Sequence, residues 1–347
     1  MRHILAAATA IFAVILTGLA PNTPVASAPA TAPEATMNEA MEDLLSYVQG
    51  QNTTGFIVMR GGETLVEENW PAPENPLFKI FLYGETESGA LFEDVASQQK
   101  SFIAVLVGIA VDKGLIDVEK PVSDYIGAGW SKATPAQEQD IKVINILNMN
   151  SGLDDKFAYE APSGSRFVYN TPVYAISKNI LTAASGLALE EMTRDWLTTP
   201  ARMTETDWRQ RPAALANVGN PTGLVTSPRD TARFGQMILK GGIGADGHRV
   251  ISEESLQAMF ERSATNPAYG RLWWLNGGEY RIAARGARED GSLVPSAPAD
   301  LVAALGFLDR RLYIVPSMDV VVVRTGADAP DADFDEQLWR RLMRVLN

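Results

Sequence analysis

Segments with the residue pattern of β-strands lie near the two ends of this 347-residue chain, and helical patterns occupy its middle. Two strand-like segments near the start, 54–59 and 64–70, flank a Gly-rich turn that is typical of a β-hairpin. Three more near the end, 271–275, 311–315 and 320–324, are rich in Val, Ile, Trp and Tyr. Because strands must pair to satisfy their backbone groups, we expect the two ends to meet in one antiparallel sheet.

Helices are predicted over the central part of the chain and beside the terminal strands. Apolar residues recur at helical spacing in 37–48 and again in 333–346. Five further helices are expected over 101–112, 141–147, 172–184, 189–197 and 228–240. The sequence therefore predicts an α/β fold: an antiparallel sheet built from both chain ends with flanking helices, and a mostly helical inserted subdomain, roughly 101–240. We expect the functional site in the cleft between the two parts.

The first thirty residues, 1–30, have the pattern of a secretory signal peptide. Arg2 gives a short positive start, 4–19 is apolar, and 21–33 is rich in Pro, Ala, Ser and Thr. We expect cleavage before Thr31, a single mature domain over 31–347, and a periplasmic or secreted location. The alternative is an uncleaved membrane anchor, which the short apolar stretch disfavours because a spanning helix needs about 20 residues.

Composition excludes several classes of chemistry. The net charge of −12 and the pI near 4.8 disfavour binding to nucleic acid or to an anionic membrane, because both would repel the chain. The chain has no Cys, which removes thiol nucleophiles, disulfides and Cys-ligated zinc. Of its two histidines, His3 lies in the predicted signal peptide and only His248 remains. A His-rich metal site is thereby excluded, and a Ser-His-Asp triad would depend on the position of His248.

Two motif-like segments are interpreted as structural. The segment 242–247 matches a dinucleotide fingerprint, but it follows a predicted helix instead of a strand, so we expect a helix end and a loop that exposes His248. The acidic segment 328–335 lacks the Gly and the closing acid of a calcium loop. Its side chains are expected to flank the N-terminus of the last helix, where the helix dipole favours negative charge.

One constellation has the residue types of a catalytic site. The sequence Ser97-Gln98-Gln99-Lys100 precedes the apolar run 102–111, which places Ser97 near the start of a buried helix and Lys100 one turn later on the same face. Without a usable histidine, a serine nucleophile needs Lys or Tyr as its base. A lysine can serve if burial lowers its pKa well below about 10.4. The alternative is a serine that caps the helix, followed by a solvated lysine.

Several separated segments, in the same order along the chain, resemble the serine hydrolases related to class C β-lactamases and penicillin-binding DD-peptidases, whose first motif is Ser-x-x-Lys. The resemblance runs from about Gly55 to Arg324. Besides the segment around Ser97, it includes 117–125, 146–153, 162–169 and 222–234. The segments 273–276 and 304–323 are most similar to the branch that contains 6-aminohexanoate-dimer hydrolase and related esterases.

The resemblance assigns the second and third motifs of the family, each with one departure. The second, Tyr-x-Asn, corresponds to Tyr169-Asn170-Thr171, which keeps Tyr169 but has Thr in the third position. The third, a Lys or His followed by a small residue and Gly on an edge strand, corresponds to 304–306, where Ala304 replaces the cation and Gly306 is kept. That cation helps to hold the carboxylate of a β-lactam or of a terminal D-alanine, so its loss argues against penicillin chemistry. A nearby arginine is the alternative source of positive charge: Arg310, Arg311 or Arg324.

The resemblance implies a serine hydrolase that cleaves an ester or amide bond through an acyl-enzyme on Ser97, and the predicted signal peptide implies that it is exported. Lys100 and Tyr169 would move the proton, and the backbone amides of Ser97 and Phe307 would form the oxyanion hole. No cofactor or metal is implied, and the partner would be a small-molecule ester or amide, with no nucleic acid and no stable membrane insertion after signal cleavage. Two alternatives remain open: a β-lactamase or DD-peptidase acting on β-lactams or peptidoglycan peptides, and a catalytically silent binding protein on the same scaffold.

Overall fold

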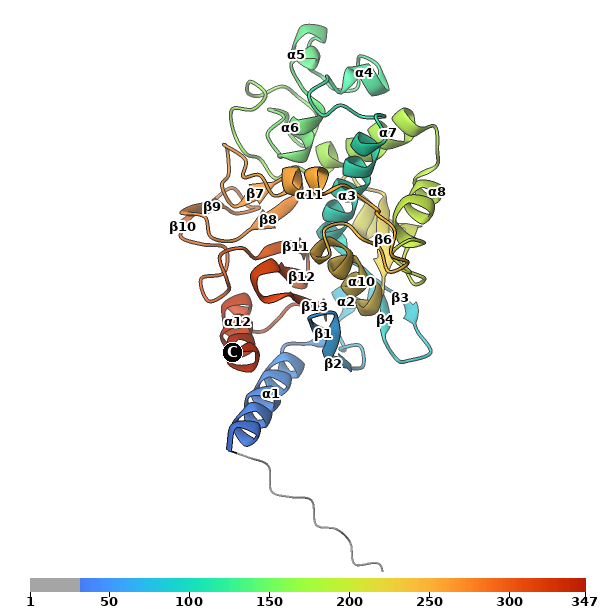
Figure 1. Cartoon of the computed structure of the whole chain (residues 1–347). Helices are drawn as coiled ribbons and strands as arrows, with labels where there is room; N and C mark the ends of the chain where they lie inside the picture. The colour runs from blue at the N-terminus through green and yellow to red at the C-terminus, as the bar shows by residue number, and fades with distance from the viewer. Residues whose placement is uncertain (1–31) are drawn as a thin grey trace, which may run out of the picture.

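The computed structural model describes residues 32–347, so the predicted signal peptide over residues 1–30 lies outside the described residues. In the described part of the chain, the main sheet has seven strands in the order β2-β1-β13-β12-β11-β8-β7, and every neighbouring pair is antiparallel (Figure 1). The pairing of β1 with β13 joins the two ends of the chain and confirms the predicted sheet. The strands are β1 (Thr53–Arg60), β2 (Glu63–Asn69), β7 (Tyr269–Gly270), β8 (Trp273–Leu275), β11 (Val302–Gly306), β12 (Arg310–Val315) and β13 (Val320–Gly326).

Helices cover both faces of this sheet. Leu312 and Tyr313 are consecutive in β12, so their side chains point to opposite faces. Tyr313 packs edge-on against Trp339 of α12 (Phe334–Leu346), which lies beside α1 (Ala32–Gly50). Leu312 faces Gly235 of α10 (Pro228–Leu239), where a Cβ atom would lie 2.9 Å from the Leu312 side chain. The absence of a side chain at Gly235 therefore lets α10 pack closely on the sheet.

The helix α3 (Gln99–Asp112) connects the sheet to the helical part of the molecule. Its residues 99–110 are all buried, which is typical of a helix enclosed by other elements on every side. Phe102 stacks on Phe234 of α10, with ring centroids 3.8 Å apart. On other sides α3 packs against α7 (Thr171–Ser185) and α11 (Glu253–Met259). At the end of the molecule opposite α1 and α12 lie α4 (Ser123–Ile126), α5 (Pro135–Gln139) and α6 (Val143–Leu147) (Figure 1).

The predicted helices are present with small shifts of their ends, but a second sheet was not expected. The helix predicted over 189–197 forms as α8 (Leu189–Thr193) followed by a π-helical turn at Arg194–Thr198. The second sheet has the order β3-β4-β6-β5, and a separate hairpin pairs β9 with β10. These strands have three to five residues each, too few to show a clear two-residue alternation of apolar side chains. They are β3 (Leu82–Glu85), β4 (Leu91–Asp94), β5 (Asp207–Gln210), β6 (Thr222–Thr226), β9 (Tyr280–Ile282) and β10 (Arg288–Asp290).

A fully buried ion pair joins the two sheets. Arg310 Nη2 of β12 lies 2.8 Å from Glu93 Oε2 of β4, and neither side chain is exposed to solvent. Glu93 also accepts a hydrogen bond from Thr54 of β1. Burying two charges requires that they compensate each other, because an unpaired charge in this environment would lose its hydration without replacement.

No helix within residues 32–347 combines the length and the apolar character needed to cross a bilayer.

We expect Arg310→Met to lower the free energy of unfolding by about 3–5 kcal/mol, because it leaves the Glu93 carboxylate buried without its partner. The double variant Arg310→Met with Glu93→Gln should recover part of this loss, since Gln is neutral and can still accept the hydrogen bond from Thr54. Urea denaturation of the three proteins measures both effects. A double variant less stable than Arg310→Met alone would show that charge compensation is not what stabilises this contact.

Candidate active site

Ser97 lies in a single 3₁₀ turn, η1 (Ala96–Gln98), between β4 and α3. Ala96 has φ 50°, a left-handed conformation that costs a non-glycine residue about 1–3 kcal/mol. Its amide donates to Asp94 Oδ1 at 2.8 Å, which stabilises this turn. The turn leaves Ser97 partly exposed, whereas Ala96 and Gln98 on either side are buried.

Lys100 contacts Ser97 from inside the protein. Its Nζ donates to Ser97 Oγ at 3.0 Å, and the side chain is 2% exposed. Burial holds the pKa of Lys100 well below its usual value, and the positive charges of Arg211 and Lys178 act in the same direction. The neutral amine is therefore favoured, and a neutral amine can accept a proton. The alternative of a solvated lysine is wrong.

Tyr169 completes the group that the sequence analysis identified. Its hydroxyl forms a hydrogen bond with Ser97, and its ring lies 4.9 Å from Lys100 Nζ. Burial raises the pKa of Tyr169 to about 12, and the hydrogen bond with Ser97 only partly opposes this. Tyr169 is therefore a neutral phenol at neutral pH and can donate a proton. Its ring stacks on Trp274, at a centroid distance of 5.9 Å.

The departure in the second motif brings another hydroxyl to Lys100. Asn170 caps α7: its Oδ1 accepts from Val173 N at 3.1 Å, and its Nδ2 donates to Leu153 O at 3.1 Å. Thr171 is the first residue of α7, and its Oγ1 accepts from Lys100 Nζ at 3.2 Å. In the sequence Thr171 is only a departure from the motif, but in the structure its hydroxyl helps to hold the lysine.

The third-motif strand lies beside Ser97. It approaches the backbone there so closely that only a glycine fits at position 306. A Cβ atom at Gly306 would collide with the carbonyl oxygen of Val95, just before the η1 turn. Strand β8 pairs only with Val302 and Ala303, so the last part of β11 has one free edge toward the cavity at Ser97. Ala304 is fully buried and contributes no charge. Phe307 follows at the turn into β12 and is 52% exposed.

None of the three arginines considered as a replacement cation lines the cavities at Ser97. Arg310 is paired with Glu93, and Arg311 is paired with Asp309 and Asp335. The guanidinium of Arg324 donates to backbone carbonyls, among them Leu308 O at 2.8 Å. The arginine replacement is therefore wrong for all three: Arg310, Arg311 and Arg324.

Two cavities meet at Ser97, and both Ser97 and Phe307 line each of them. The first, which we call the polar lobe, has a volume of about 480 Å³. Its other lining side chains include Tyr169, Trp274, Arg281, Glu289 and Asp335. The second, the apolar lobe, has a volume of about 320 Å³. Its other polar lining residues are Lys100, Thr171, Arg211 and Asn220, and its other apolar ones are Leu77, Ile80, Phe81, Ala96, Ala214, Leu215 and Val218.

The arginine of the polar lobe was missed by the sequence analysis. Arg281 lies in β9, and its guanidinium is 2.5 Å from Glu289 of the paired strand β10. It also donates to the carbonyls of Ser292 and Leu293, at 2.8 and 2.9 Å. Its charge is thus compensated by a carboxylate in the same lobe. No sequence motif marks this residue, because its position depends on the fold of the β9–β10 hairpin.

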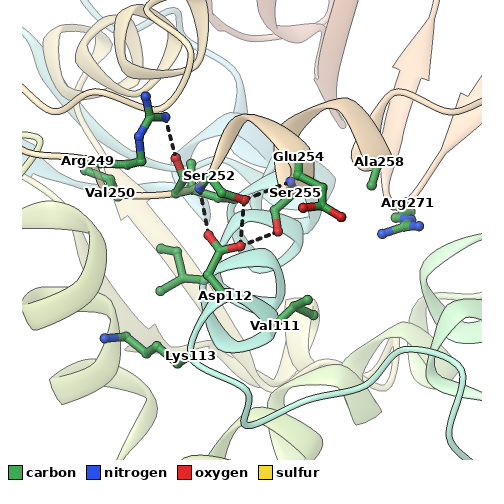
Figure 2. Close-up of a pocket in the computed structure, with 12 residues that line it drawn as sticks. Val111, Asp112, Lys113, Arg249, Val250, Ser252, Glu254, Ser255, Ala258 and Arg271 are labelled. Carbon is green, nitrogen blue, oxygen red and sulfur yellow. Dashed lines mark hydrogen bonds between the residues drawn. The ribbon is translucent and has the colours of Figure 1, made fainter.

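A larger cavity of about 750 Å³ lies elsewhere, between the end of α3 and the start of α11 (Figure 2). Its central carboxylate, Asp112, accepts hydrogen bonds from Ser252 N, Ser252 Oγ and Ser255 Oγ, at 2.7, 2.7 and 2.6 Å. These contacts fasten the first turn of α11, and the cavity lining contains no serine beside a lysine or histidine. It therefore lacks the arrangement needed for nucleophilic catalysis.

The remaining motif-like segments have the structural roles expected of them. The segment 242–247 forms a loop after α10, and the side chain of His248 is 84% exposed and pairs with Asp246. It does not line either lobe at Ser97, so a Ser-His-Asp triad is not formed there. Asp335 lies in the first turn of α12. Among residues 32–347, no group of three or more His, Cys, Asp or Glu is placed to hold a metal ion.

Comparison with known proteins agrees with this geometry. A family model described as Beta-lactamase matches residues 46–342, most of the chain. The chain belongs to the beta-lactamase family. The 6-aminohexanoate-dimer hydrolase of Paenarthrobacter ureafaciens is 25% identical over 349 residues, covering 84% of this chain and 77% of that protein. Together these matches confirm the resemblance and identify a hydrolase with the serine β-lactamase fold.

Solved structures share this fold at low sequence identity. A β-lactamase of Mycobacterium bovis superposes with a TM-score of 0.63 at 15% identity, covering 88% of this chain and 98% of that one. EstCE1, described as a hydrolase with promiscuous acyltransferase activity, gives a TM-score of 0.63 at 12% identity, covering 91% and 100%. The fold of this beta-lactamase family member is thus common to proteins described as β-lactamases and as hydrolases of other kinds.

A buried polar network lies behind Lys100 in this family member. Lys178 of α7 donates to Gln99 Oε1, Asn220 Oδ1 and Thr222 O, at 2.9, 2.8 and 2.7 Å. Burial is the main cause that lowers the pKa of Lys178 to about 7. Nearby, Arg211 forms a two-bond contact with Asp94, with both distances 2.7 Å. The sequence contains one signal of this network, because Lys178 lies on the same face of the predicted helix as the apolar Tyr174 and Leu181.

We expect Lys100→Met to raise the free energy of unfolding at pH 7, because the buried amine has a folded-state pKa below that of the unfolded chain. Between those two pKa values the unfolded state binds more protons, so wild-type stability increases with pH up to about 10.4. The variant should lose the part of this increase that Lys100 causes, while the part caused by Lys178, whose pKa is also lowered by burial, should remain. Denaturation at pH 7 and pH 9.5 measures it, with the exposed Lys120→Met as the matched control. A Lys100→Met protein that keeps the wild-type pH slope would contradict the assignment of a neutral buried lysine.

Proposed function

We propose that the protein hydrolyses small neutral carboxylic esters, and linear amides more slowly, through an acyl-enzyme on Ser97. The observation that carries this proposal is the 3.0 Å contact between Ser97 Oγ and the Nζ of a lysine that is 2% exposed and has a lowered pKa. A serine hydroxyl becomes an effective nucleophile when an adjacent base removes its proton. A buried neutral lysine is such a base.

Acylation follows from the positions of the three side chains. Neutral Lys100 takes the Ser97 proton while Oγ attacks the substrate carbonyl carbon. The negative oxygen of the tetrahedral intermediate is held by the backbone amides of Ser97 and Phe307, the two residues that line both lobes. The phenol of Tyr169 donates a proton to the leaving alcohol or amine, and Lys100 returns its proton to Tyr169. The products of this half are the acyl-enzyme and the free leaving group.

Deacylation uses the same groups in the opposite direction. A water molecule takes the place of the leaving group and gives a proton to the Lys100–Tyr169 pair as its oxygen attacks the acyl carbon. The bond to Ser97 Oγ then breaks, and Oγ recovers a proton from this pair. The acid is released and Ser97 is restored, so no cofactor enters the cycle.

Charge at the site favours neutral substrates over β-lactams. Ala304 supplies no cation, and Arg281 is already paired with Glu289. A substrate carboxylate would lose its hydration without a free positive partner, which costs several kcal/mol.

Linear amides enter the proposal because a relative is named as a hydrolase of a 6-aminohexanoate dimer.

We further propose that the enzyme acts after export, in the periplasm or outside the cell. The support is the N-terminal pattern of one basic residue, an apolar stretch and small residues, all within residues 1–33. Fractionation of expressing cells, with mass determination of the mature N-terminus, tests this location. Full-length protein confined to the cytoplasm would contradict it.

Ser97→Ala should reduce ester hydrolysis by a factor on the order of a thousand or more, because the variant lacks the nucleophile. It should also lose covalent labelling by a fluorophosphonate, which the wild type should show. Ser88→Ala, at an exposed turn between β3 and β4, is the matched control and should keep both. Turnover of Ser97→Ala within a few-fold of wild type would refute the assignment, and an unlabelled, inactive wild type would favour a silent binding protein.

The wild-type enzyme should turn over a small acyl ester far better than a chromogenic cephalosporin, because only the cephalosporin carries a carboxylate. The comparison is of kcat/KM on the two substrates at the same pH. If the wild-type kcat/KM on the cephalosporin equals that on the ester, the result would instead support a β-lactamase or DD-peptidase.

A further inference from the structure

The apolar lobe exposes hydrophobic side chains that a protein surface normally avoids. Eight large hydrophobic residues among those described are exposed, and three of them line this one cavity: Leu77, Val218 and Phe307. Their exposed fractions are 40%, 50% and 52%. Behind them the wall continues inward with the buried side chains of Phe81 and Leu215. A cluster of this kind beside a nucleophile indicates a binding surface for an apolar group.

The charged groups of this lobe already have partners. Arg211 is held by both oxygens of Asp94 and also donates to Asn220 O at 3.2 Å. Lys100 is committed to Ser97 and Thr171. A charged substrate group entering the lobe would therefore find no free partner of opposite charge, whereas a hydrocarbon chain needs none.

The catalytic side chains determine which end of the substrate enters each lobe. Tyr169 lines the polar lobe and does not line the apolar one. In the proposed mechanism Tyr169 protonates the leaving group, and a proton donor must lie within hydrogen-bond reach of the atom that it protonates. The leaving group is therefore directed to the polar lobe. The acyl chain, on the other side of the carbonyl carbon, is directed to the apolar lobe.

We propose that the apolar lobe binds the acyl chain of the substrate and that the enzyme prefers unbranched, medium-length acyl esters. This inference rests on the proposed hydrolysis through Ser97. A methylene group takes up about as much room as a water molecule in the liquid, about 30 Å³, so 320 Å³ holds about ten such groups. The rim at Leu77 and Val218 is open to solvent, so part of this volume does not enclose the chain. We therefore expect the lobe to bury an acyl chain of fewer than ten carbons, about six to eight.

The test is a series of p-nitrophenyl esters from acetate to dodecanoate, in which only the acyl chain changes. The kcat/KM should rise with each added methylene by up to about fourfold, the factor for burying one CH₂ group. The rise should end near hexanoate to octanoate and the value should then fall. A series of alkyl acetates, in which only the alcohol lengthens, should show a much weaker trend.

Ala214→Trp places an indole in the mouth of the apolar lobe at an exposed position of the one-turn helix α9 (Ala213–Ala216). We expect the ratio of octanoate to acetate kcat/KM to fall at least tenfold in this variant. Ala213→Trp is the matched control: Ala213 is the exposed neighbour on the same helix and does not line the lobe, so the ratio should stay at the wild-type value.

Failure of this inference can be told from failure of the proposed function. Suppose that a fluorophosphonate labels Ser97, but kcat/KM does not change along the acyl series or the octanoate-to-acetate ratio is unchanged in Ala214→Trp. This result would overturn the acyl assignment, while the proposed hydrolysis through Ser97 would still hold. If Ala214→Trp instead lowered kcat/KM for the long alkyl acetates and not for the long acyl esters, the acyl assignment would be overturned, because the leaving group would then occupy the lobe. An unlabelled and inactive wild type would overturn both proposals.

Discussion

Burial of Lys100 is the constraint on which the site depends. A lysine in water is almost wholly protonated at neutral pH and cannot take a proton from serine. The pKa of this one is lowered because it lies in the first turn of α3, a helix covered by other elements on every side. Two further cations, Arg211 and Lys178, reinforce the effect and are themselves held by fixed polar partners. The interior around α3 thus determines the environment of the base proposed for Ser97.

Placement of Ser97 depends in turn on contacts between elements that are distant in the sequence. The left-handed turn at Ala96 is stabilised by Asp94, whose other partner is Arg211. The third-motif strand reaches the same turn because Gly306 has no side chain to separate it from Val95. A change at either of these contacts would displace the serine relative to its base without touching either residue. The geometry of the proposed catalytic pair and the local stability are therefore coupled at this turn.

The parts of this molecule that follow local rules could be predicted from the sequence. The spacing of Ser97 and Lys100 on one helical turn places their side chains together, and the strand-rich chain ends lead to a single sheet. The second sheet could not be predicted, because short strands such as β4 and β6 are stabilised by partners far away in the chain. For the same reason Arg281 and Arg211 gave no signal, since each reaches the site only through tertiary contacts.

The wall of the apolar lobe is built from small, peripheral pieces of structure. Leu77 belongs to α2 (Pro76–Lys79) and Leu215 to α9, each a helix of four residues outside the main sheet. Substitutions in such short segments disturb few backbone hydrogen bonds, and loops tolerate sequence change better than the elements that they connect. During evolution this wall can therefore diverge quickly while Ser97 and Lys100 stay fixed. That freedom offers a physical route by which one catalytic centre can come to serve many different substrates across a family.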